Sequence, residues 1–196
     1  LLDYTFSDGN SADAQGTGDN PGTTAGSVTV AVANVDDAPT LTAAGNDPDH
    51  QPGTPSDIFK TVVADTIEAG QTFSSLTLTV SNLADGADEV LGIDGSTVAL
   101  TDGSSIASTA TNGLMVDVTV SGTTATMTVT GGTLSEADLQ TLVDGLSYNN
   151  AATTPTLGNR VVTITEVVDS GSDAAPNANT AMPNLQTTVA VVEVPS

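Results

Sequence analysis

Residues 28–39 read VTVAVANVDDAP. Valine alternates there with small or polar residues, a period of two that predicts a β-strand with one buried face. Asp36 and Asp37 follow this strand, and Pro39 then blocks further pairing because proline has no backbone N–H to donate. A strand that ends in paired carboxylates and a proline predicts the boundary between two modules, joined by an acidic linker.

The two carboxylates at this boundary also predict a cation site. Asp36 and Asp37 offer the oxygen ligands that a hard cation such as Ca²⁺ requires. A cation bound there would stiffen the chain at the place where it is expected to bend. The alternative is a solvated acidic linker that binds nothing.

The composition favours cations as partners. The 196 residues include 24 Asp and Glu but only 2 Lys and Arg, which gives a formal net charge of -22 at pH 7. This charge repels nucleic-acid backbones and anionic membrane surfaces, so we expect neither as a partner. It also repels itself, and bound Ca²⁺ would relieve that repulsion in the folded state.

The residues available for a core and for cross-links limit the fold. Hydrophobic residues make up 38% of the chain but aromatic residues only 3%, so the core must be built mainly from Val, Leu, Ile and Ala. The chain has no Cys, which excludes disulfides, thiolate zinc sites and a thiol nucleophile. No apolar run reaches the length of a membrane span and no signal peptide is visible, so we expect no direct membrane insertion.

Two parts of the chain resemble each other and predict a repeat. The first comprises residues 4–10 and 29–36, and the second comprises residues 163–171 and 188–195. Each consists of a strand, an Asp-containing turn, a long polar loop and a closing strand.

This repeat predicts the domain organisation. We expect residues 1–38 to be the C-terminal strands of a preceding β-sandwich repeat, and residues 39–196 to be a complete one. The chain starts within a predicted strand and without Met, so we expect it to be a fragment of a longer polypeptide.

Within the second repeat, alternating residues predict strands at 76–80, 116–120 and 124–130. A short loop around Gly122 joins the last two as a hairpin. Their outward residues are nearly all Thr, which suits an exposed strand face. Short strands separated by Gly, Asn and Asp turns predict an all-β sandwich.

Residues 134–145 predict one short crossover helix at an end of the sandwich. Ser135 is a suitable N-cap, and Asp138 stands where the acidic member of a capping box belongs. Gly145 supplies the C-terminal stop. The apolar face of this helix consists of Leu139, Leu142 and Val143.

Several stretches carry a resemblance to a known family. They read SNLADGADEVL at residues 81–91, GLSYNN at 145–150, PTLGNRVVTIT at 155–165 and DSG at 169–171, besides VDDAP at 35–39. Together they resemble the cadherin-like (Ig-like) tandem repeats of giant bacterial surface proteins and RTX-type adhesins. The resemblance implies an extracellular, cadherin-like β-sandwich that is chained in tandem and usually depends on calcium.

The resemblance also bears on two acidic positions. Glu68 is similar in position to an early Glu that completes calcium sites between cadherin-like repeats, so it would join Asp36 and Asp37. The chain departs from the family at the turn after Val168, where such repeats often carry Asp-Asn-Gly-Gly. Here Ser170 stands in place of a better oxygen ligand.

A dense acidic loop is a further candidate calcium site. Asp85, Asp88 and Glu89 lie at positions i, i+3 and i+4 around a Gly. They could converge on one ion. They could equally form a turn held open by their repulsion.

The last candidate ligands come from the repeat itself. Asp169 and Asp173 lie in the long polar loop of the second copy, and Asp8 and Asp13 lie at the equivalent positions of the first. Acidic residues at matched positions of two copies favour a shared role in binding calcium.

Nothing in the sequence predicts an enzyme. The single His, His50, lies beside prolines, and we expect it to be exposed. There is no Trp to line a sugar cleft, and no nucleophile elbow, phosphate loop or zinc-binding helix occurs. Arg160, next to a predicted strand start, is expected to pair with a nearby carboxylate.

We therefore expect a calcium-stiffened structural or extender module of a large extracellular bacterial adhesin or surface protein. Its partners would be neighbouring repeats of the same polypeptide or adjacent subunits, while other modules contact a cell surface or glycan. Two alternatives stay open: a sugar- or protein-binding module of such an adhesin, and a filament subunit joined by strand addition. A binding module should show a concave aromatic or apolar patch, whereas a spacer should be polar all round.

Overall fold

The chain divides into two compact units, Leu1–Val35 and Asp36–Ser196. The computed structural model describes residues 2–7, 23–28 and 35–193. The division falls before Asp36, whereas the sequence placed it after Ala38. Asp36 and Asp37 therefore belong to the second unit.

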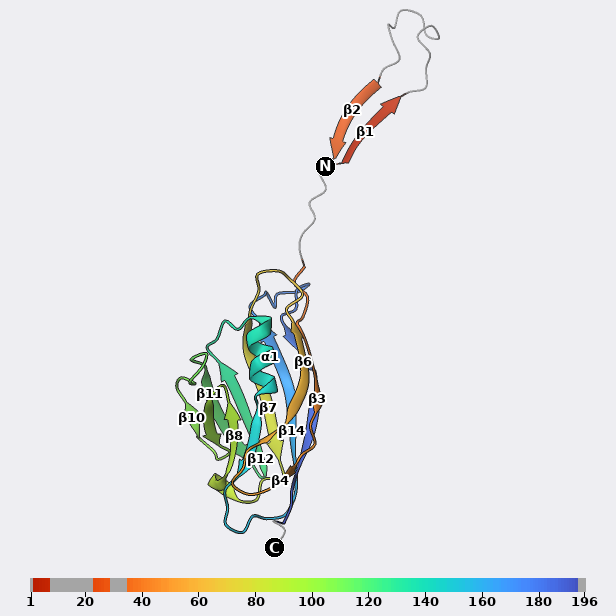
Figure 1. The fold of residues 1–196 in the computed structure, drawn as a ribbon. Coiled ribbons are helices and arrows are strands. Elements are labelled where there is room, and N and C mark those ends of the chain that lie inside the picture. The colour runs from red at the N-terminus through yellow and green to blue at the C-terminus, as the bar shows by residue number, and fades with distance from the viewer. Residues whose placement is uncertain (1, 8–22, 29–34, 194–196) are drawn as a thin grey trace, which may run out of the picture. The chain divides into compact units, whose positions relative to one another are not determined.

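The described part of the first unit is a pair of antiparallel strands, β1 (Leu2–Ser7) and β2 (Thr23–Val28) (Figure 1). Leu2 lies opposite Val28, and Ser7 lies opposite Thr23. The sequence predicted a closing strand at residues 28–35, of which 29–34 lie outside the described residues. The predicted ligands Asp8 and Asp13 lie outside them as well.

The larger sheet of the second unit is centred on β7 and β14. Its strands follow the order β10-β11-β12-β7-β14-β16-β4, and β15 pairs with β14 beside that path. All of these pairs are antiparallel except β16 with β4, which is parallel. The bounds are β4 Asp49–His50, β7 Phe73–Ser81, β10 Ser105–Ile106, β11 Met115–Ser121, β12 Thr124–Thr130, β14 Gly158–Asp169, β15 Thr180–Ala181 and β16 Leu185–Val191.

A smaller sheet has the order β5-β13-β8-β9, and β3 pairs with β6 as a separate ribbon. Helix α1 (Glu136–Asp144) packs against β6, and the short 3-10 helix η1 (Gly86–Asp88) precedes β8 (Figure 1). The strand bounds are β3 Thr40–Gly45, β5 Ser56–Asp57, β6 Phe59–Asp65, β8 Glu89–Ile93, β9 Ser96–Ala99 and β13 Ser147–Asn150.

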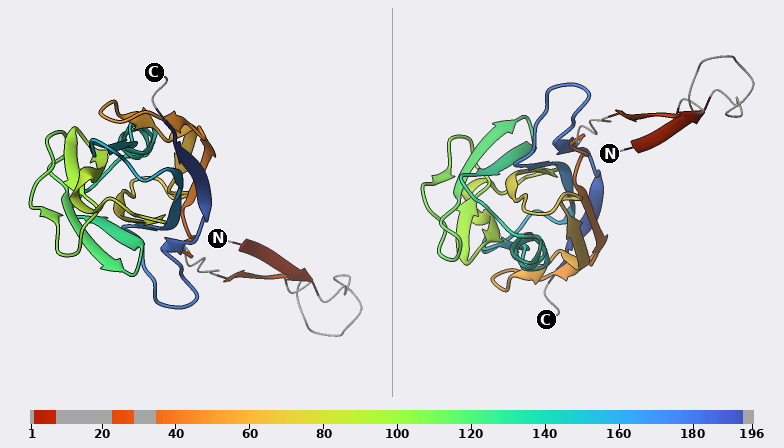
Figure 2. Two further views of the ribbon diagram at one scale, coloured as in Figure 1. Left: turned by 90° about the horizontal axis from the view of Figure 1, so that it is seen from below. Right: turned by 90° about the horizontal axis from the view of Figure 1, so that it is seen from above.

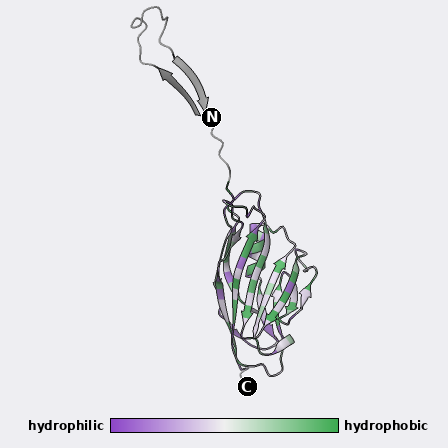
Figure 3. Cartoon of the chain, turned by 180° about the vertical axis from the view of Figure 1, so that it is seen from behind, coloured by the Kyte–Doolittle hydropathy of each residue, from purple (hydrophilic) through white to green (hydrophobic). Residues whose placement is uncertain are grey.

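The sheets of the second unit surround one core, as the views along the strands show (Figure 2). Leu76, Leu78 and Val80 of β7 are buried, while the residues between them are partly exposed. The same alternation runs along β11 and β12, and colouring by hydropathy shows it as bands along the strands (Figure 3). Strand-period patterning of this kind buries one face of each sheet. The all-β prediction is therefore confirmed.

The outward face of the larger sheet carries paired threonines. Thr79 of β7 lies opposite Thr126 of β12, and Thr77 lies opposite Thr128. The hairpin between β11 and β12 closes as predicted, with Ser121 opposite Thr124 and Gly122 at a φ of 61°.

Helix α1 is capped as the sequence predicts. The Ser135 side chain accepts a hydrogen bond from the Asp138 N–H at 3.2 Å, and the Asp138 carboxylate accepts one from the Ser135 N–H, also at 3.2 Å. Gly145 is the C-cap residue, with a φ of -87° that is not left-handed. The predicted apolar face, formed by Leu139, Leu142 and Val143, is buried.

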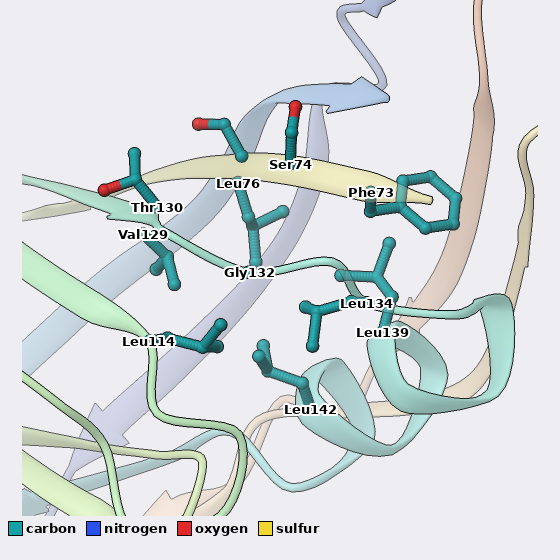
Figure 4. Close-up of a pocket in the computed structure, with 11 residues that line it drawn as sticks. Phe73, Ser74, Leu76, Leu114, Val129, Thr130, Gly132, Leu134, Leu139 and Leu142 are labelled. Carbon is teal, nitrogen blue, oxygen red and sulfur yellow. The ribbon is translucent and has the colours of Figure 1, made fainter. Parts of the chain in front are cut away.

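Beneath α1, the core leaves a cavity of about 10 Å³ (Figure 4). Leucine side chains from the helix and from neighbouring strands line it, among them Leu76, Leu114 and Leu139. A volume of this size holds one water at most, so it is a packing gap and not a ligand pocket.

One expectation about an individual residue was wrong. His50 was predicted to be exposed because it lies beside prolines, but its side chain is fully buried. Strand β4, which carries it, pairs with β16 and brings the ring into the interior. The residues around His50 in the sequence do not predict its burial, because the strand that pairs with β4 lies near the other end of the chain.

Candidate metal centre

Three acidic residues from separate segments meet at one end of the second unit. Asp36 precedes β3, Glu68 lies in the turn between β6 and β7, and Asp169 is the last residue of β14. Strand β14 pairs with β7 up to Asp169, opposite Phe73, and so brings Asp169 to the turn that precedes β7. All three are residues that the sequence selected as metal ligands.

Asp36 is held by backbone and side-chain contacts to the loop after β14. Its N–H donates to Asn177 Oδ1 at 2.9 Å, and its carbonyl accepts from the Ala178 N–H, also at 2.9 Å. Gln71 Nε2 donates to Asp36 Oδ1. The side chain is 7% exposed and lies against Gly171, where an added Cβ would overlap the Asp36 carboxylate. The loop therefore needs glycine at this position.

Glu68 is presented by a tight turn. The Ile67 N–H donates to Asp65 Oδ1 at 2.7 Å, and Thr66 Oγ1 donates to the Glu68 carbonyl at 3.2 Å. Ile67 adopts a φ of 69°, a left-handed conformation that is costly for a β-branched residue. Glu68 Oε1 accepts from the Asp37 N–H at 3.1 Å. The side chain thus reaches the segment that carries Asp36.

Asp169 is the most enclosed of the three. It is 1% exposed, and one oxygen, Oδ1, accepts from the Gly171 N–H at 2.8 Å. Burial raises the pKa of Asp169, and the negative charges of Asp36 and Glu68 raise it further, against the opposing effect of the Gly171 hydrogen bond. The three carboxylates are therefore close enough to repel one another.

Four buried oxygens of this cluster have no hydrogen-bond partner among the described residues: Asp36 Oδ2, Glu68 Oε2, Gln71 Oε1 and Asp169 Oδ2. Buried polar atoms in native proteins are nearly always paired. Unpaired carboxylate and amide oxygens are also the donor set of a hard cation. In residues 35–193, no three His, Asp or Glu side chains already form a compact metal centre. To hold one cation, these side chains would have to rotate toward a common point.

The remaining residues predicted at this end lie outside the cluster. The Asp37 side chain is exposed, and only its N–H takes part, through Glu68. Asp173 is also exposed. Ser170 Oγ accepts a hydrogen bond from the Thr72 N–H at 3.1 Å, and the Ser170 N–H donates one to the Thr72 carbonyl at 2.8 Å. Ser170 therefore extends the pairing of β14 with β7 beyond the end of these strands.

The acidic loop at Asp85, Asp88 and Glu89 has a different role. Arg160 donates to Glu89 Oε1 at 2.6 Å and to Asp85 Oδ2 at 3.2 Å, so the predicted ion pair of Arg160 is confirmed. Tyr148 also donates to Glu89 Oε1, at 2.6 Å. The other Glu89 oxygen accepts from the N–H groups of residues 84 and 85, at 2.7 and 2.9 Å.

Asp85 is bonded as fully as Glu89. Desolvation opposes its ionisation, but hydrogen bonds from Thr156 and Asn150 hold the pKa of Asp85 below its usual value. Asp88 is exposed in η1. The Arg160 guanidinium already compensates the charge of these two carboxylates and occupies their oxygens. We therefore assign this cluster a structural role and leave it out of the candidate metal centre.

Sequence reasoning missed the neutral partners of the acidic residues. Gln71 and Asn177 join Asp36, and Asn150 joins Asp85 to His50 across the sheets. Asp94 was missed as well: its carboxylate accepts from Thr109 Oγ1 and from both nitrogens of Asn112. The sequence feature that could have identified Asp94 is the Asp-Gly pair of a hairpin turn. Asp94 and Gly95 join β8 to β9 with φ values of 49° and 73°.

Comparisons of the chain with protein-family models, with curated proteins and with solved structures give no match. Among the described residues, no helix combines the length and the apolar character needed to cross a membrane.

Proposed function

We propose that this chain is a structural module of a large extracellular bacterial surface protein, and that Ca²⁺ held by Asp36, Glu68 and Asp169 stabilises its second unit. The observation that carries the proposal is the set of unpaired buried oxygens at these residues and at Gln71. The cadherin-like character rests on the resemblance of the sequence alone.

The energetics support a bound cation. A buried polar group without a partner costs about 1–3 kcal/mol, and several share one site here. A cation would remove that cost and would also offset the repulsion among three carboxylates. It would fix the segment around Asp36, by which the chain enters the second unit.

The donor chemistry favours calcium among the common metals. The cluster supplies carboxylate and amide oxygens, with no thiolate or imidazole for zinc or copper. The oxygens come from a turn, a loop and a strand end, an irregular arrangement that suits the flexible coordination of Ca²⁺ better than the strict octahedron of Mg²⁺.

The outward face of β7 and β12 supports a structural role over ligand binding at that face. The outward faces of β7 and β12 carry threonine pairs, with no aromatic side chain between them. A binding module would present an apolar or aromatic hollow. Thr-coated strands keep a module hydrated on that face.

Thermal unfolding of the full chain tests the proposal. At a calcium concentration about a hundred times the dissociation constant, binding adds about 2.7 kcal/mol. For a unit of this size the midpoint should rise by roughly 5–10 °C relative to chelator. Isothermal titration calorimetry should show binding directly, and Mg²⁺ should bind more weakly.

Matched variants assign the effect to the site. Asp36→Asn and Asp169→Asn should each reduce or abolish the calcium response. Asp117→Asn removes the same charge from an exposed position on β11 and should leave the response intact. Identical melting curves in calcium and in chelator, with no heat of binding, would refute the proposal.

A further inference from the structure

The only His of the chain is buried where the two sheets meet. His50 is fully buried at the end of β4. The ring Nδ1 lies 3.0 Å from Ser56 Oγ of β5, and Nε2 lies 3.0 Å from the backbone nitrogen of Asn150 in β13. Through β4 the residue belongs to the larger sheet, and through these two contacts it reaches the smaller one.

These contacts determine the protonation state of the ring. A backbone N–H can only donate, so Nε2 must accept and carries no proton. The proton of the neutral ring is therefore on Nδ1, from which it is donated to Ser56 Oγ. Protonation of Nε2 would break the bond to Asn150 and leave two N–H groups facing each other.

The surroundings oppose a positive charge on His50. The Tyr148 ring packs edge-on against the imidazole, with 5.1 Å between centroids. Burial lowers the pKa of His50, and the Arg160 guanidinium lowers it further.

The charged and titratable groups on the elements packed around this ring are few. Arg160 and Glu89 neutralise each other, and Glu89 also accepts from Tyr148. Asp85 binds Arg160 and Asn150. Asp49 of β4 and Asp57 of β5 are exposed. No carboxylate therefore contacts the imidazole in the described structure to compensate a charge there.

We propose that His50 is an acid-sensitive latch that holds β4 against β16. In its neutral form the ring ties β4, the last strand of the larger sheet, to Ser56 and Asn150 of the smaller sheet. There the Ala190 N–H donates to the Pro48 carbonyl at 2.9 Å, and the Val192 N–H donates to the His50 carbonyl at 3.2 Å. When the ring takes up a proton, it must leave the interior, and β4 leaves with it.

The direction of the pH effect follows from linkage. The released ring titrates near the ordinary His value of about 6.5, whereas the buried ring titrates lower. The open form therefore binds more protons in that interval, and the opening equilibrium increases as the pH falls. At one unit below the ordinary value, opening should be more frequent than at neutral pH by a factor of up to about ten.

Hydrogen exchange measured on the full chain by NMR tests the latch. After correction for intrinsic exchange rates, protection of the Ala190 and Val192 amides should fall by up to about tenfold between about pH 7.5 and about pH 5.5. The Leu78 amide, in the middle of the larger sheet, should keep its protection. The single imidazole signal should titrate below its ordinary value and show the proton on Nδ1.

Two variants separate the latch from other titrations. His50→Gln should remove the pH dependence of the Ala190 and Val192 amides in this interval. Asp169→Asn should retain it, because Asp169 lies at the opposite end of β14 from Arg160. Unchanged protection of these amides at low pH would overturn the proposal, as would equal loss at Leu78. The wild-type measurements decide the question even if His50→Gln fails to fold.

Discussion

Among the described residues, one ion pair is fully buried, that of Arg160 with Glu89 near His50. Arg160 and Glu89 are 2% and 0% exposed, and each uses its charge on the other. A buried pair adds little net stability over apolar residues of the same shape, but breaking it leaves one charge unpaired. The pair therefore has a large effect on the free energy of unfolding only when one of its two residues is replaced.

Replacement of Glu89 should reveal this asymmetry. We expect Glu89→Ala to destabilise the chain by about 3–5 kcal/mol, because Arg160 and the Tyr148 hydroxyl both lose their acceptor in the interior. Asp88→Ala removes a neighbouring carboxylate that is exposed, and it should change the free energy of unfolding by about 0.5 kcal/mol or less. Urea unfolding measures both. Equal effects of the two variants would show that the pair is not buried in solution.

Neutralising Asp169 should stabilise the cation-free protein, whereas removing the Glu89 carboxylate should destabilise it. Its pKa is raised in the folded state, so the folded state holds its proton more tightly than the unfolded one. Without a cation, the contribution of Asp169 to the stability of the chain should therefore decrease as the pH rises from about 4 through its folded pKa. At neutral pH the repulsion is at its full extent.

Asp169→Asn should then stabilise the cation-free protein. In chelator at neutral pH we expect a gain on the order of 1 kcal/mol, because the amide oxygen can still accept from the Gly171 N–H while the charge is lost. In saturating calcium the order should reverse, with the wild type more stable. Urea titrations in both conditions check this, and a variant less stable in chelator would contradict it.

At the scale of elements, α1 and the β11–β12 hairpin are the parts that sequence reasoning identified most completely. Both depend on residues near one another in the chain: Ser135 with Asp138 in the helix, and Gly122 in the hairpin. Local hydrogen bonds and backbone preferences decide such elements.

Ser135→Ala should weaken the first turn of α1. The substitution removes the oxygen that accepts from the Asp138 N–H, and it also removes the hydroxyl that donates to Asp138 Oδ2 at 2.6 Å. We expect a loss of about 1 kcal/mol, measured by thermal or urea unfolding. Ser135→Asp keeps an acceptor at the N-cap but faces Asp138, so it should recover only part of the loss. No change in Ser135→Ala would show that the cap contributes nothing.

The parts that the sequence could not predict are those set by pairing between distant residues. The burial of His50 depends on β16, more than a hundred residues away, and Gln71 reaches Asp36 only because β14 pairs with β7. Acidic residues could be selected as ligands by residue type. Of the eight candidates that lie in the described residues, three proved to be neighbours: Asp36, Glu68 and Asp169. Of the other five, Asp85 and Glu89 are bound by Arg160, whose position depends on the same distant pairings, and Asp37, Asp88 and Asp173 are exposed.

At the scale of the whole chain, the division between the units decides which fragments should fold. A fragment that begins at Asp36 keeps the candidate metal ligands, all of β3 and the core residue Leu41. One that begins at Ala43 loses Asp36 and Leu41 and cuts β3. We therefore expect residues 36–196 to fold cooperatively, and residues 43–196 to be less stable by about 2–5 kcal/mol.

Circular dichroism melts of the two fragments test this expectation. Calcium should raise the melting temperature of residues 36–196 but have little effect on residues 43–196. If both fragments melted alike and responded alike to calcium, neither Asp36 nor Leu41 would belong to the folded second unit.

The enclosure of Tyr148 has an optical consequence. The chain has 2 Tyr and no Trp, and Tyr148 is the tyrosine of the second unit. Its ring lies against His50 and its hydroxyl donates to the Glu89 carboxylate, an arrangement that quenches phenol fluorescence. With Tyr4 replaced by Phe, ultraviolet emission would come from this ring alone and would brighten when the cluster opens. The second unit thus contains a natural fluorophore beside the residue proposed to release β4.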